Sequence, residues 1–431
     1  MKKFDKSSAQ LSRAELSIPL GSQTFSKSKT QYPVGISPLY ATKSKGAYIW
    51  DVDGNRFIDL VNSLAAVTFG YGDKGIEKSI IKQLKLGVSL SLPAKLESEV
   101  AELVTELVPC AEMVRFSKNG SDATSAAIRL ARAFTGRDHV LVCGYHGWQD
   151  WFIGSTSRNK GVPEAVSDLT HTFNYNDLDS LKTKLDFLNN KNNKVAAVII
   201  EPMNSTYPNA GFLQGVKELT HKAGAILIFD EVITGFRFSK GGAQELFGVT
   251  PDLATFGKGI ANGFPLSAVV GRKDVMLEME KVFISGTFGG ELLSLAAAKH
   301  VLGRHSKLDI CGELNAKGQS LFDLTNSAIQ DSGLTDLVSL SGHPSWKFIN
   351  WKPINDYTIE ALKTYFMQEI FQEGILVLGT HNISLAHTNQ VIKKIADSYF
   401  KVFKKIKAAI DAENLIQQLR VEPVTPLFRV R

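Results

Sequence analysis

Two short stretches of the sequence are apolar at every position, and they constrain the fold more than any other feature. VAAVII, residues 195–200, and AILIF, residues 225–229, lack the alternation of apolar and polar side chains that a strand with one wet face shows. Strands that are buried on both faces belong to parallel sheets that helices cover on both sides. We therefore expect an α/β fold whose ligands bind at the carboxyl ends of the strands.

The pattern of elements changes along the chain and predicts its domains. Residues 1–45 contain scattered Ser, Lys and Gly, with prolines near the end, which predicts an irregular N-terminal arm. Residues 46–75 alternate apolar and polar side chains around Asp53-Gly54, which indicates a hairpin in the N-terminal part of a small domain. Helices and apolar strands alternate over residues 76–305, the predicted large domain, and residues 306–431 complete the small α+β domain.

Charge and cysteine content narrow the classes of function. The net charge of +6 is spread along the chain, whereas a nucleic-acid-binding protein would show basic residues gathered in a patch. No apolar run approaches the length of a membrane span, and MKKFDKSSAQ at the N-terminus lacks the apolar segment of a signal peptide. Cys110, Cys143 and Cys311 are odd in number and far apart, so no disulfide framework is implied. These features predict a cytoplasmic protein with no nucleic-acid or membrane partner.

The segment NGSDAT, residues 119–124, follows a short predicted strand and begins a helix. Free backbone amides at a helix N-terminus, with the hydroxyl of Ser121 beside them, form a site for an anion such as a phosphate. The alternative is an ordinary helix cap made by Ser121 or Asp122. An Asp is compatible with a bound phosphate only if its side chain turns away from it.

Asp230 ends the apolar stretch AILIF, and Glu231 follows it directly. A carboxylate in such a place is paired with a cation or belongs to a binding site. A metal site would need more ligands at suitable spacing, and Cys143 and His146 have no second pair to complete a zinc set. We therefore expect no metal. A protonated pyridine nitrogen is a cation that a single carboxylate such as Asp230 can neutralise in a dry pocket.

Lys258 lies between two glycines in LATFGKGIANGFPLSAVV, residues 253–270, a segment that otherwise reads as buried. The GKG sequence lacks the Ser or Thr that follows the lysine of a P-loop, and its glycine spacing does not match a dinucleotide-binding loop. The remaining interpretation is an amine whose pKa falls because an apolar pocket disfavours its charged form. A neutral amine can attack a carbonyl and hold it covalently.

One ligand would satisfy all of these sites. Pyridoxal 5′-phosphate (PLP) combines a phosphate, a cationic ring nitrogen and an aldehyde. Tyr145, at the end of another predicted strand, offers an aromatic face for the ring. Each residue alone could be an ordinary buried polar group, but an ordered series of strand-end residues that fits one ligand is hard to obtain by chance.

The segments IIEP, IFDEVITGFR, YHG and the long run that ends in GKGIANGFPLSAVVG resemble the class III aminotransferases of fold type I. Within that class the chain is most similar to the group around glutamate-1-semialdehyde aminomutase, and the likeness runs from YIWDVDGN to HNISLAHTN. The resemblance implies a mixed, mostly parallel sheet with helices on both faces, a smaller α+β domain, and PLP bound in the large domain. It also implies a homodimer with shared active sites.

The resemblance assigns roles to individual residues. It makes Lys258 the Schiff-base lysine and proton shuttle, and Asp230 the partner of the pyridine nitrogen. Thr287, in SGTFGG, would reach the phosphate that the neighbouring subunit binds. The other matched positions are Gly120 and Ser121 at the phosphate, Val232 and Tyr145 on opposite faces of the ring, and His146 and Glu201, to which the resemblance gives no definite role.

This chain also departs from the family pattern. The family's Ser-Gly-Thr-Glu-Ala reads Asn-Gly-Ser-Asp-Ala at residues 119–123, and its Gly-Asn-Pro after the shared threonine reads Gly-Gly-Glu at residues 289–291. The aminomutase's arginine, which clamps the substrate carboxylate from a Ser-Pro-Val-Arg stretch, has no counterpart in YPVGISPLYATKSKGAY, residues 32–48. We therefore expect transfer of an amino group from a small-molecule donor to a ketone or aldehyde without a nearby carboxylate, such as a keto-sugar. An intramolecular aminomutase and a non-catalytic binding protein of the same fold are the alternatives.

Overall fold

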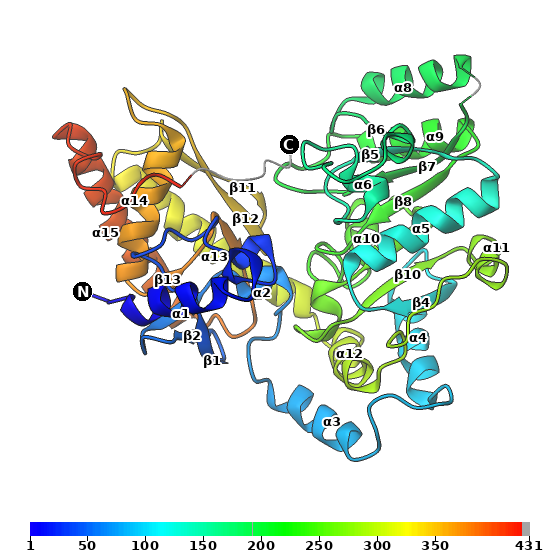
Figure 1. Ribbon diagram of the computed structural model, residues 1–431, viewed down its shortest axis with the longest axis horizontal. Helices are drawn as coiled ribbons and strands as arrows, with labels where there is room; N and C mark the ends of the chain where they lie inside the picture. The colour runs from blue at the N-terminus through cyan, green and yellow to red at the C-terminus, as the bar shows by residue number, and fades with distance from the viewer. Residues whose placement is uncertain (192, 425–431) are drawn as a thin grey trace. The chain divides into compact units, whose positions relative to one another are not determined.

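The structure is a computed structural model that describes residues 1–191 and 193–424 (Figure 1). Within these residues the chain divides into two compact units. The first, which we call the sheet unit, is Lys74–Gly312. The second, the terminal unit, combines Met1–Asp73 with the segment that begins at Glu313.

The sheet unit is built around a mixed sheet, which among the described residues has seven strands. Neighbouring strands are parallel except where β10 pairs with β4 and with β9. The predicted mixed, mostly parallel sheet is therefore confirmed. The order across the sheet is β4 (Met113–Ser117), β10 (Ser267–Gly271), β9 (Leu253–Phe256), β8 (Ile226–Asp230), β7 (Val195–Ile200), β5 (His139–Cys143) and β6 (Thr170–Thr172).

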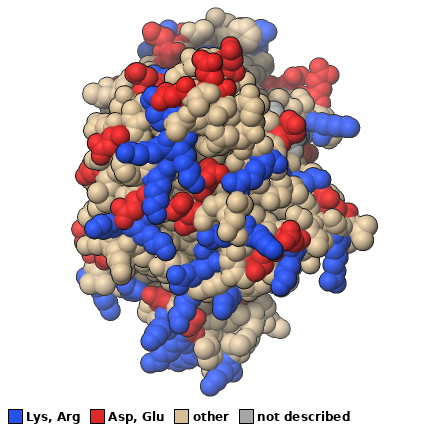
Figure 2. Space-filling model, turned by 90° about the vertical axis from the view of Figure 1, so that its left-hand side faces the viewer, with Lys and Arg blue, Asp and Glu red and all other residues tan. Residues whose placement is uncertain are grey.

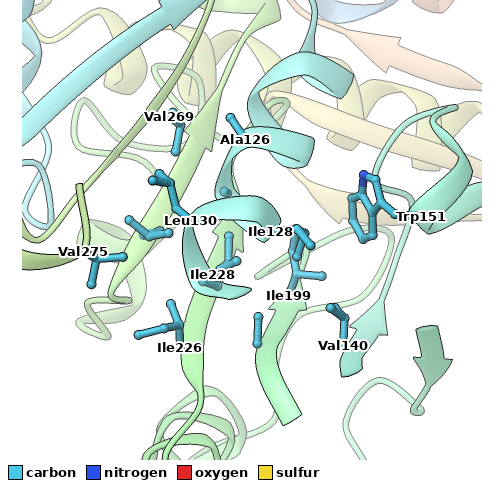
Figure 3. Packing of buried hydrophobic residues seen from close by; sticks show 14 of the residues in the cluster. Ala126, Ile128, Leu130, Val140, Trp151, Ile199, Ile226, Ile228, Val269 and Val275 are labelled. Atoms are coloured by element: carbon cyan, nitrogen blue, oxygen red, sulfur yellow. The ribbon is translucent and has the colours of Figure 1, made fainter. Parts of the chain in front are cut away.

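The core of the sheet unit forms where β7 and β8 are covered on both faces. Every residue of these two strands is buried, as their apolar sequences predict. Helix α5 (Gly120–Thr135) packs across the sheet, and its alanines allow it to approach the strands closely. Figure 3 shows Ala126 and Leu130 of this helix among side chains of the strands, including Ile228 and Val269.

Helices connect the strands of the sheet unit, and α5 shows why they begin and end where they do. It starts after Asn119, whose backbone amide donates to the carboxylate of Asp122, and it ends at Gly136, which adopts a left-handed conformation with φ of 63°. The other helical segments are α3 (Lys74–Leu84), α4 (Lys95–Leu107), α6 (Asp150–Ile153), α7 (Glu164–Ser167), α8 (Leu178–Asn190), α9 (Phe212–Lys222), α10 (Ala243–Phe247), η3 (Lys258–Ala261), α11 (Lys273–Met276), η4 (Leu277–Glu280) and α12 (Leu292–His305). Helix α13 (Ile310–Asp331) contains the boundary between the units.

The terminal unit has the α+β composition that the sequence predicts. Its long helices α14 (Ile359–Gln372) and α15 (Asn389–Asp411) pack through the rings of Phe366, Tyr399 and Phe403. The hairpin predicted around Asp53-Gly54 is present as the antiparallel pair β2 and β3. Among the described residues, one sheet of this unit has the order β1 (Ala41–Lys45), β2 (Tyr48–Asp51), β3 (Arg56–Asp59) and β13 (Ile375–Leu376). A second sheet has the order β11 (Val338–His343), β12 (Trp346–Trp351) and β14 (Thr380–Asn382). The short helices described here are η1 (Pro19–Gly21), η2 (Phe25–Lys27) and α2 (Asn62–Ala65).

The N-terminal residues are not the irregular arm that we expected over residues 1–45, because they contain helix α1 (Asp5–Glu15). The carboxylate of Asp53 caps this helix by accepting hydrogen bonds from the amides of Lys6 (2.7 Å) and Ser7 (2.9 Å). Asp53 is 47 positions away from Lys6 in the sequence, so no local sequence pattern reveals this helix cap.

The last features of the described chain concern its apolar helices and the charges on its surface. No helix within residues 1–191 and 193–424 combines the length and the apolarity that crossing a membrane requires. On the face drawn in Figure 2, Lys and Arg side chains are interspersed with Asp and Glu rather than gathered in one stripe.

Candidate active site

The candidate active site lies at the carboxyl ends of β5, β7, β8 and β9 in the sheet unit. Asp230 is the last residue of β8, Glu201 directly follows β7, and Lys258 comes shortly after β9. Tyr145 and His146 lie in the loop after β5. Because parallel strands end at the same edge of a sheet, residues that are far apart in the sequence meet here.

Asp230 and His146 form the central contact of this site. Nδ1 of His146 lies 2.8 Å from Oδ2 of Asp230, and Oδ1 of Asp230 accepts hydrogen bonds from the amide of Val232 (3.1 Å) and the hydroxyl of Thr255 (3.3 Å). The imidazole is buried and packs edge-on against Phe152, with the ring centroids 5.3 Å apart. Its Nε2 atom has no hydrogen-bond partner within the described part of the chain. His146 therefore fixes the orientation of the Asp230 carboxylate from one side.

Lys258 has the environment that a reactive amine needs. Desolvation lowers the pKa of Lys258 below its usual value, although the charges of Asp230 and Glu201 oppose the shift. Its backbone is also strained, since φ is 37°, in the left-handed region that costs a non-glycine residue about 1–2 kcal/mol. Strain of this kind is concentrated at functional sites, where the surrounding structure holds it.

Asp122 makes the helix cap at the turn that precedes α5. Its carboxylate accepts hydrogen bonds from the amides of Asn119 (2.8 Å) and Lys118 (3.3 Å), so that it points back over the turn. The hydroxyl of Ser121 instead accepts a hydrogen bond from the amide of Trp148 (3.3 Å). The capping alternative is thus correct for Asp122, and its side chain does not compete with an anion for Ser121.

Glycines allow the chain to pack closely around this turn. A Cβ atom on Gly120 would approach Cγ1 of Val232 to 3.0 Å, and one on Gly257 would approach the same atom to 3.2 Å. Gly147 has a φ of 107°, and a Cβ atom there would collide with Ser121. Larger residues at these positions would push Val232 and the loop of Gly147 away from the start of α5.

Glu201 holds the loop that carries Tyr145. Its Oε2 atom accepts hydrogen bonds from the amide of Tyr145 (2.9 Å) and from Nδ2 of Asn204 (3.0 Å). Gly144 allows the close approach, because its φ is 115° and a Cβ atom would come within 2.5 Å of the carboxylate. Burial raises the pKa of Glu201, and the neighbouring charge of Asp230 adds to the shift. The carboxylate therefore acts on Tyr145 through the backbone.

Glu231, although adjacent to Asp230, does not belong to the site. It is fully buried and accepts hydrogen bonds from the amides of Ala243 (2.6 Å) and Gln244 (2.9 Å) and from the hydroxyl of Thr234 (2.5 Å). These contacts cap the short helix α10. The two consecutive carboxylates thus have separate roles, one in the site and one in the scaffold.

Thr287 is not part of this cluster within a single copy. It is exposed, on a turn between η4 and α12, and it lines a cavity of about 800 Å³ together with Lys118 and Gln149. The structure therefore brings together most of the predicted site residues and leaves Thr287 at the surface.

Comparison with a family model identifies the family of this chain. The model of aminotransferase class III matches residues 31–407. This chain is a class III aminotransferase. A 3-aminobutyryl-CoA aminotransferase of Cloacimonas acidaminovorans (strain Evry) is 34% identical over 389 residues, which cover 86% of this chain and 91% of the relative. A glutamate-1-semialdehyde 2,1-aminomutase of Syntrophobacter fumaroxidans is 33% identical over 401 residues, which cover 87% and 92%.

Solved structures agree with this assignment. An omega-transaminase from Sphaerobacter thermophilus matches with a TM-score of 0.83 and 28% identity over 93% of this aminotransferase and 97% of that chain. The FumI protein of Sphingopyxis sp. MTA144, solved in a PLP form, matches with a TM-score of 0.86 and 26% identity over 96% and 98%. The class III aminotransferase therefore has the fold of type I, and PLP is its cofactor.

The residues of the aminotransferase fit PLP on structural grounds. The Asp230 carboxylate, braced by His146, would face the ring nitrogen, and the desolvated Lys258 would face the aldehyde. The N-terminus of α5, with the Ser121 hydroxyl beside it, suits a phosphate. Among the described residues no cluster of three potential metal ligands exists.

Two residues of the site were missed by the sequence analysis. Thr255 donates to Asp230, and Asn204 donates to Glu201. Thr255 could have been found as the polar residue of an otherwise apolar strand, LATF, next to the lysine segment. Asn204 lies three residues after Glu201 and has no comparable signal in the sequence.

Proposed function

We propose that this aminotransferase moves an amino group from a small-molecule donor to a ketone or aldehyde that has no carboxylate next to the reacting carbon. Keto-sugars and acyl thioesters with a carbonyl group are acceptors of this kind. The observation that carries the proposal is the lack of an arginine in residues 32–48, where related aminomutases hold the substrate carboxylate.

The segment 32–48 also lines a cavity of about 240 Å³ in the terminal unit. It is lined by Tyr32 and Tyr40 of that segment, by the buried Asp59, and by Tyr71, whose hydroxyl donates to the Asp59 carboxylate at 2.7 Å. Lys27 also lines it, and the lining described for this cavity contains no arginine. A planar, two-pronged clamp for a carboxylate is therefore lacking in this lining.

A relative supports the same class of acceptor. The enzyme of Cloacimonas acidaminovorans is named for 3-aminobutyryl-CoA, in which the acyl carboxyl is a thioester rather than a free carboxylate. An enzyme for such a compound needs no arginine at the acyl end. We therefore include 3-oxoacyl thioesters beside keto-sugars among the acceptors to be tested.

The residues of the site would have different roles in the reaction. Bound PLP supplies an electron sink for the charge that remains when a substrate carbon loses a proton. Nζ of Lys258 would take that proton from the substrate carbon and deliver it to the carbon of the PLP aldehyde group, since a lowered pKa makes its neutral form available. Asp230 would keep the ring nitrogen protonated, and His146 and Thr255 would keep the carboxylate in place.

We also propose a homodimer in which Thr287 contacts the PLP phosphate of the second copy. Phe283 and Phe288, which flank Thr287, are 84% and 58% exposed. Further large apolar side chains are exposed at the end of α3 and in the loop after it: Ile81, Leu84, Leu86, Leu90 and Leu92. Exposed apolar surface on this scale is typical of protein–protein contact sites. Light scattering after gel filtration should give twice the monomer mass.

The activity is tested by mixing the PLP-loaded protein with a panel of amino donors and following the absorbance of bound PLP. We expect at least one donor to convert the spectrum and to release its keto acid. Adding keto-sugars or 3-oxoacyl thioesters should then restore the spectrum. If every donor leaves the spectrum unchanged and forms no keto acid, transamination is the wrong reaction.

The aminomutase reaction is a second candidate because a relative named for it is 33% identical over most of this chain. In that reaction the amino group moves between neighbouring carbons of one molecule. A substrate labelled with ¹⁵N, mixed with unlabelled substrate of distinguishable mass, separates the two reactions. Transfer of the label between molecules supports the aminotransferase, and retention in the same molecule supports the aminomutase.

A further inference from the structure

Basic side chains of β4, of α5 and of the turn between them hold the segment 283–291, which carries Thr287. The junction of this same strand and helix contains the turn of Gly120 and Ser121. The segment is therefore fastened to the element that would bind the phosphate in its own copy. The contacts are Arg115 Nη2 to the carbonyl of Ile284 (3.2 Å), Arg129 Nη1 to the carbonyl of Phe283 (2.9 Å) and Lys118 Nζ to Oε2 of Glu291 (3.0 Å).

Glu291 joins the charged side chain of Lys118 to the start of α12. Its Oε1 atom accepts from the amide of Leu293 (2.7 Å), and its Oε2 atom accepts from the amide (3.2 Å) and the hydroxyl (2.6 Å) of Ser294, so it caps α12. The side chains of Glu291 and Lys118 are 13% and 19% exposed. An ion pair that is largely removed from water is screened less by salt than one at the surface.

The ionised form of Glu291 is favoured by its surroundings. Burial by itself would raise the pKa of Glu291, but hydrogen bonds from Ser294, Lys118 and the amide of Leu293 lower the pKa below its usual value. The carboxylate therefore carries its charge at neutral pH, where it attracts Lys118.

The turn between Thr287 and Glu291 is compact and rests on the end of β4. The amide of Glu291 donates to the carbonyl of Phe288 at 3.2 Å. A Cβ atom on Gly289 would lie 3.3 Å from the carbonyl oxygen of Phe116, which leaves little space below the turn. A displacement of Glu291 would therefore be passed on to Thr287.

We propose that Glu291 is a positioning residue, which through its ion pair with Lys118 holds Thr287 in place for the cofactor phosphate of a second copy. The inference rests on the shared-site dimer proposed above. It concerns the stretch 289–291, where this chain reads Gly-Gly-Glu and the family pattern reads Gly-Asn-Pro. None of the three family residues has a carboxylate for Lys118, so the ion pair is a feature of this chain's own sequence.

Cofactor binding tests this inference without relying on the activity of the loaded enzyme. Glu291→Gln keeps an oxygen to cap α12 but removes the charge, and Lys118→Met removes the partner. We expect each variant to weaken PLP binding by roughly two- to fivefold, the range of an ion pair that is not fully buried. Pyridoxal, which lacks the phosphate, should bind as it does to the unchanged protein, and the double variant should be no weaker than either single variant.

Glu99→Gln is the matched control. It breaks the ion pair of Glu99 with Lys299 (2.7 Å), which joins α4 to the exposed side of α12 and does not involve the turn. PLP binding should be unchanged in this variant, and the thermal unfolding of the apoprotein should be the same for Glu291→Gln and Glu99→Gln. Equal weakening of PLP and pyridoxal, or no weakening of PLP, would overturn the inference.

Mixed dimers show in which copy Glu291 acts. One dimer pairs an unchanged chain with a chain that carries both Lys258→Ala and Glu291→Gln, so the site that keeps Lys258 receives Thr287 from the altered turn. The other pairs Glu291→Gln with Lys258→Ala, so that site receives Thr287 from an unaltered turn. We expect weaker PLP binding at the Lys258 site, followed by the absorbance of lysine-linked cofactor, only in the first dimer. Weakening only in the second dimer would overturn the inference.

The outcomes separate this inference from the proposed function. If Lys258→Ala retains full transamination, the proposed chemistry is wrong, whereas the PLP and pyridoxal affinities still test the role of Glu291. If the protein is a monomer at working concentration, the contact between copies is wrong, and the inference falls with it even if transamination is observed.

Discussion

Two regions of the sheet unit that are proposed to contact PLP are held in different ways. Asp230 and His146 are buried at the strand ends and contact each other, so one copy of the chain orients them. Thr287 is exposed on a turn that Lys118 and Glu291 fasten from the side. This difference indicates that the ring of the cofactor would be held by buried residues that are already in place in one copy. In the proposed dimer, the phosphate end is completed only when a second copy binds.

Replacing Lys258 should have the largest effect on the reaction. Lys258→Ala removes the amine that would move the substrate proton, and we expect the rate of the first half-reaction to fall by at least about 10²–10⁴-fold. Stopped-flow absorbance measures this rate. Lys299→Ala, at an exposed lysine of α12, is the control and should keep the rate. A Lys258→Ala protein that reacts at the original rate would show that the strand-end cluster is not the chemical centre.

The next test compares the neighbouring carboxylates Asp230 and Glu231, because replacing the first should reduce the reaction rate and replacing the second should reduce the stability. Asp230→Asn should lower the rate by about 10²-fold, as other losses of electrostatic stabilisation do, with little change in stability. Glu231→Gln should lower the free energy of unfolding by about 1–3 kcal/mol, because amides of buried residues lose a charged acceptor. Urea denaturation and half-reaction rates, measured on both proteins, distinguish the two roles. Equal effects on rate would contradict the separation.

The pH dependence of stability tests the enclosure of Lys258. Its pKa is lowered in the folded apoprotein from the usual 10.5, so between the lowered pKa and 10.5 the unfolded chain binds more protons at this residue. The free energy of unfolding should therefore increase with pH across this window. The increase should be smaller in Lys258→Met, which has no group to titrate. Parallel curves for the two proteins would mean that Lys258 is as well hydrated as a surface lysine.

The smallest effect is expected at the exposed turn. Thr287→Val keeps the shape of the side chain and removes its hydroxyl, which should weaken PLP binding by about fivefold, the typical value of one hydrogen bond. Fluorescence titration with PLP and with pyridoxal measures the loss, and only PLP should be affected. A loss of pyridoxal affinity as well would place Thr287 at the ring rather than at the phosphate.

The sequence predicted the architecture and most of the cluster for a physical reason. Burial on both faces leaves an uninterrupted apolar run, and the run itself shows where β7 and β8 lie. The residue that ends such a run must lie at an edge of the sheet, which is why Asp230 and Glu201 could be selected. Helix α1 was missed because its cap, Asp53, is remote in the sequence.

By itself, the sequence determined the type of sheet, the strand ends where polar groups gather, and a lysine enclosed by apolar neighbours, because these depend on residues adjacent along the chain. Only the tertiary structure decided the partners of the two neighbouring carboxylates. Asp230 meets His146 across 84 positions, while Glu231 turns to α10. It also decided that Glu291 pairs with Lys118 across 173 positions. Such contacts depend on how the strands and helices pack, and that packing is settled by the whole core rather than by any local stretch.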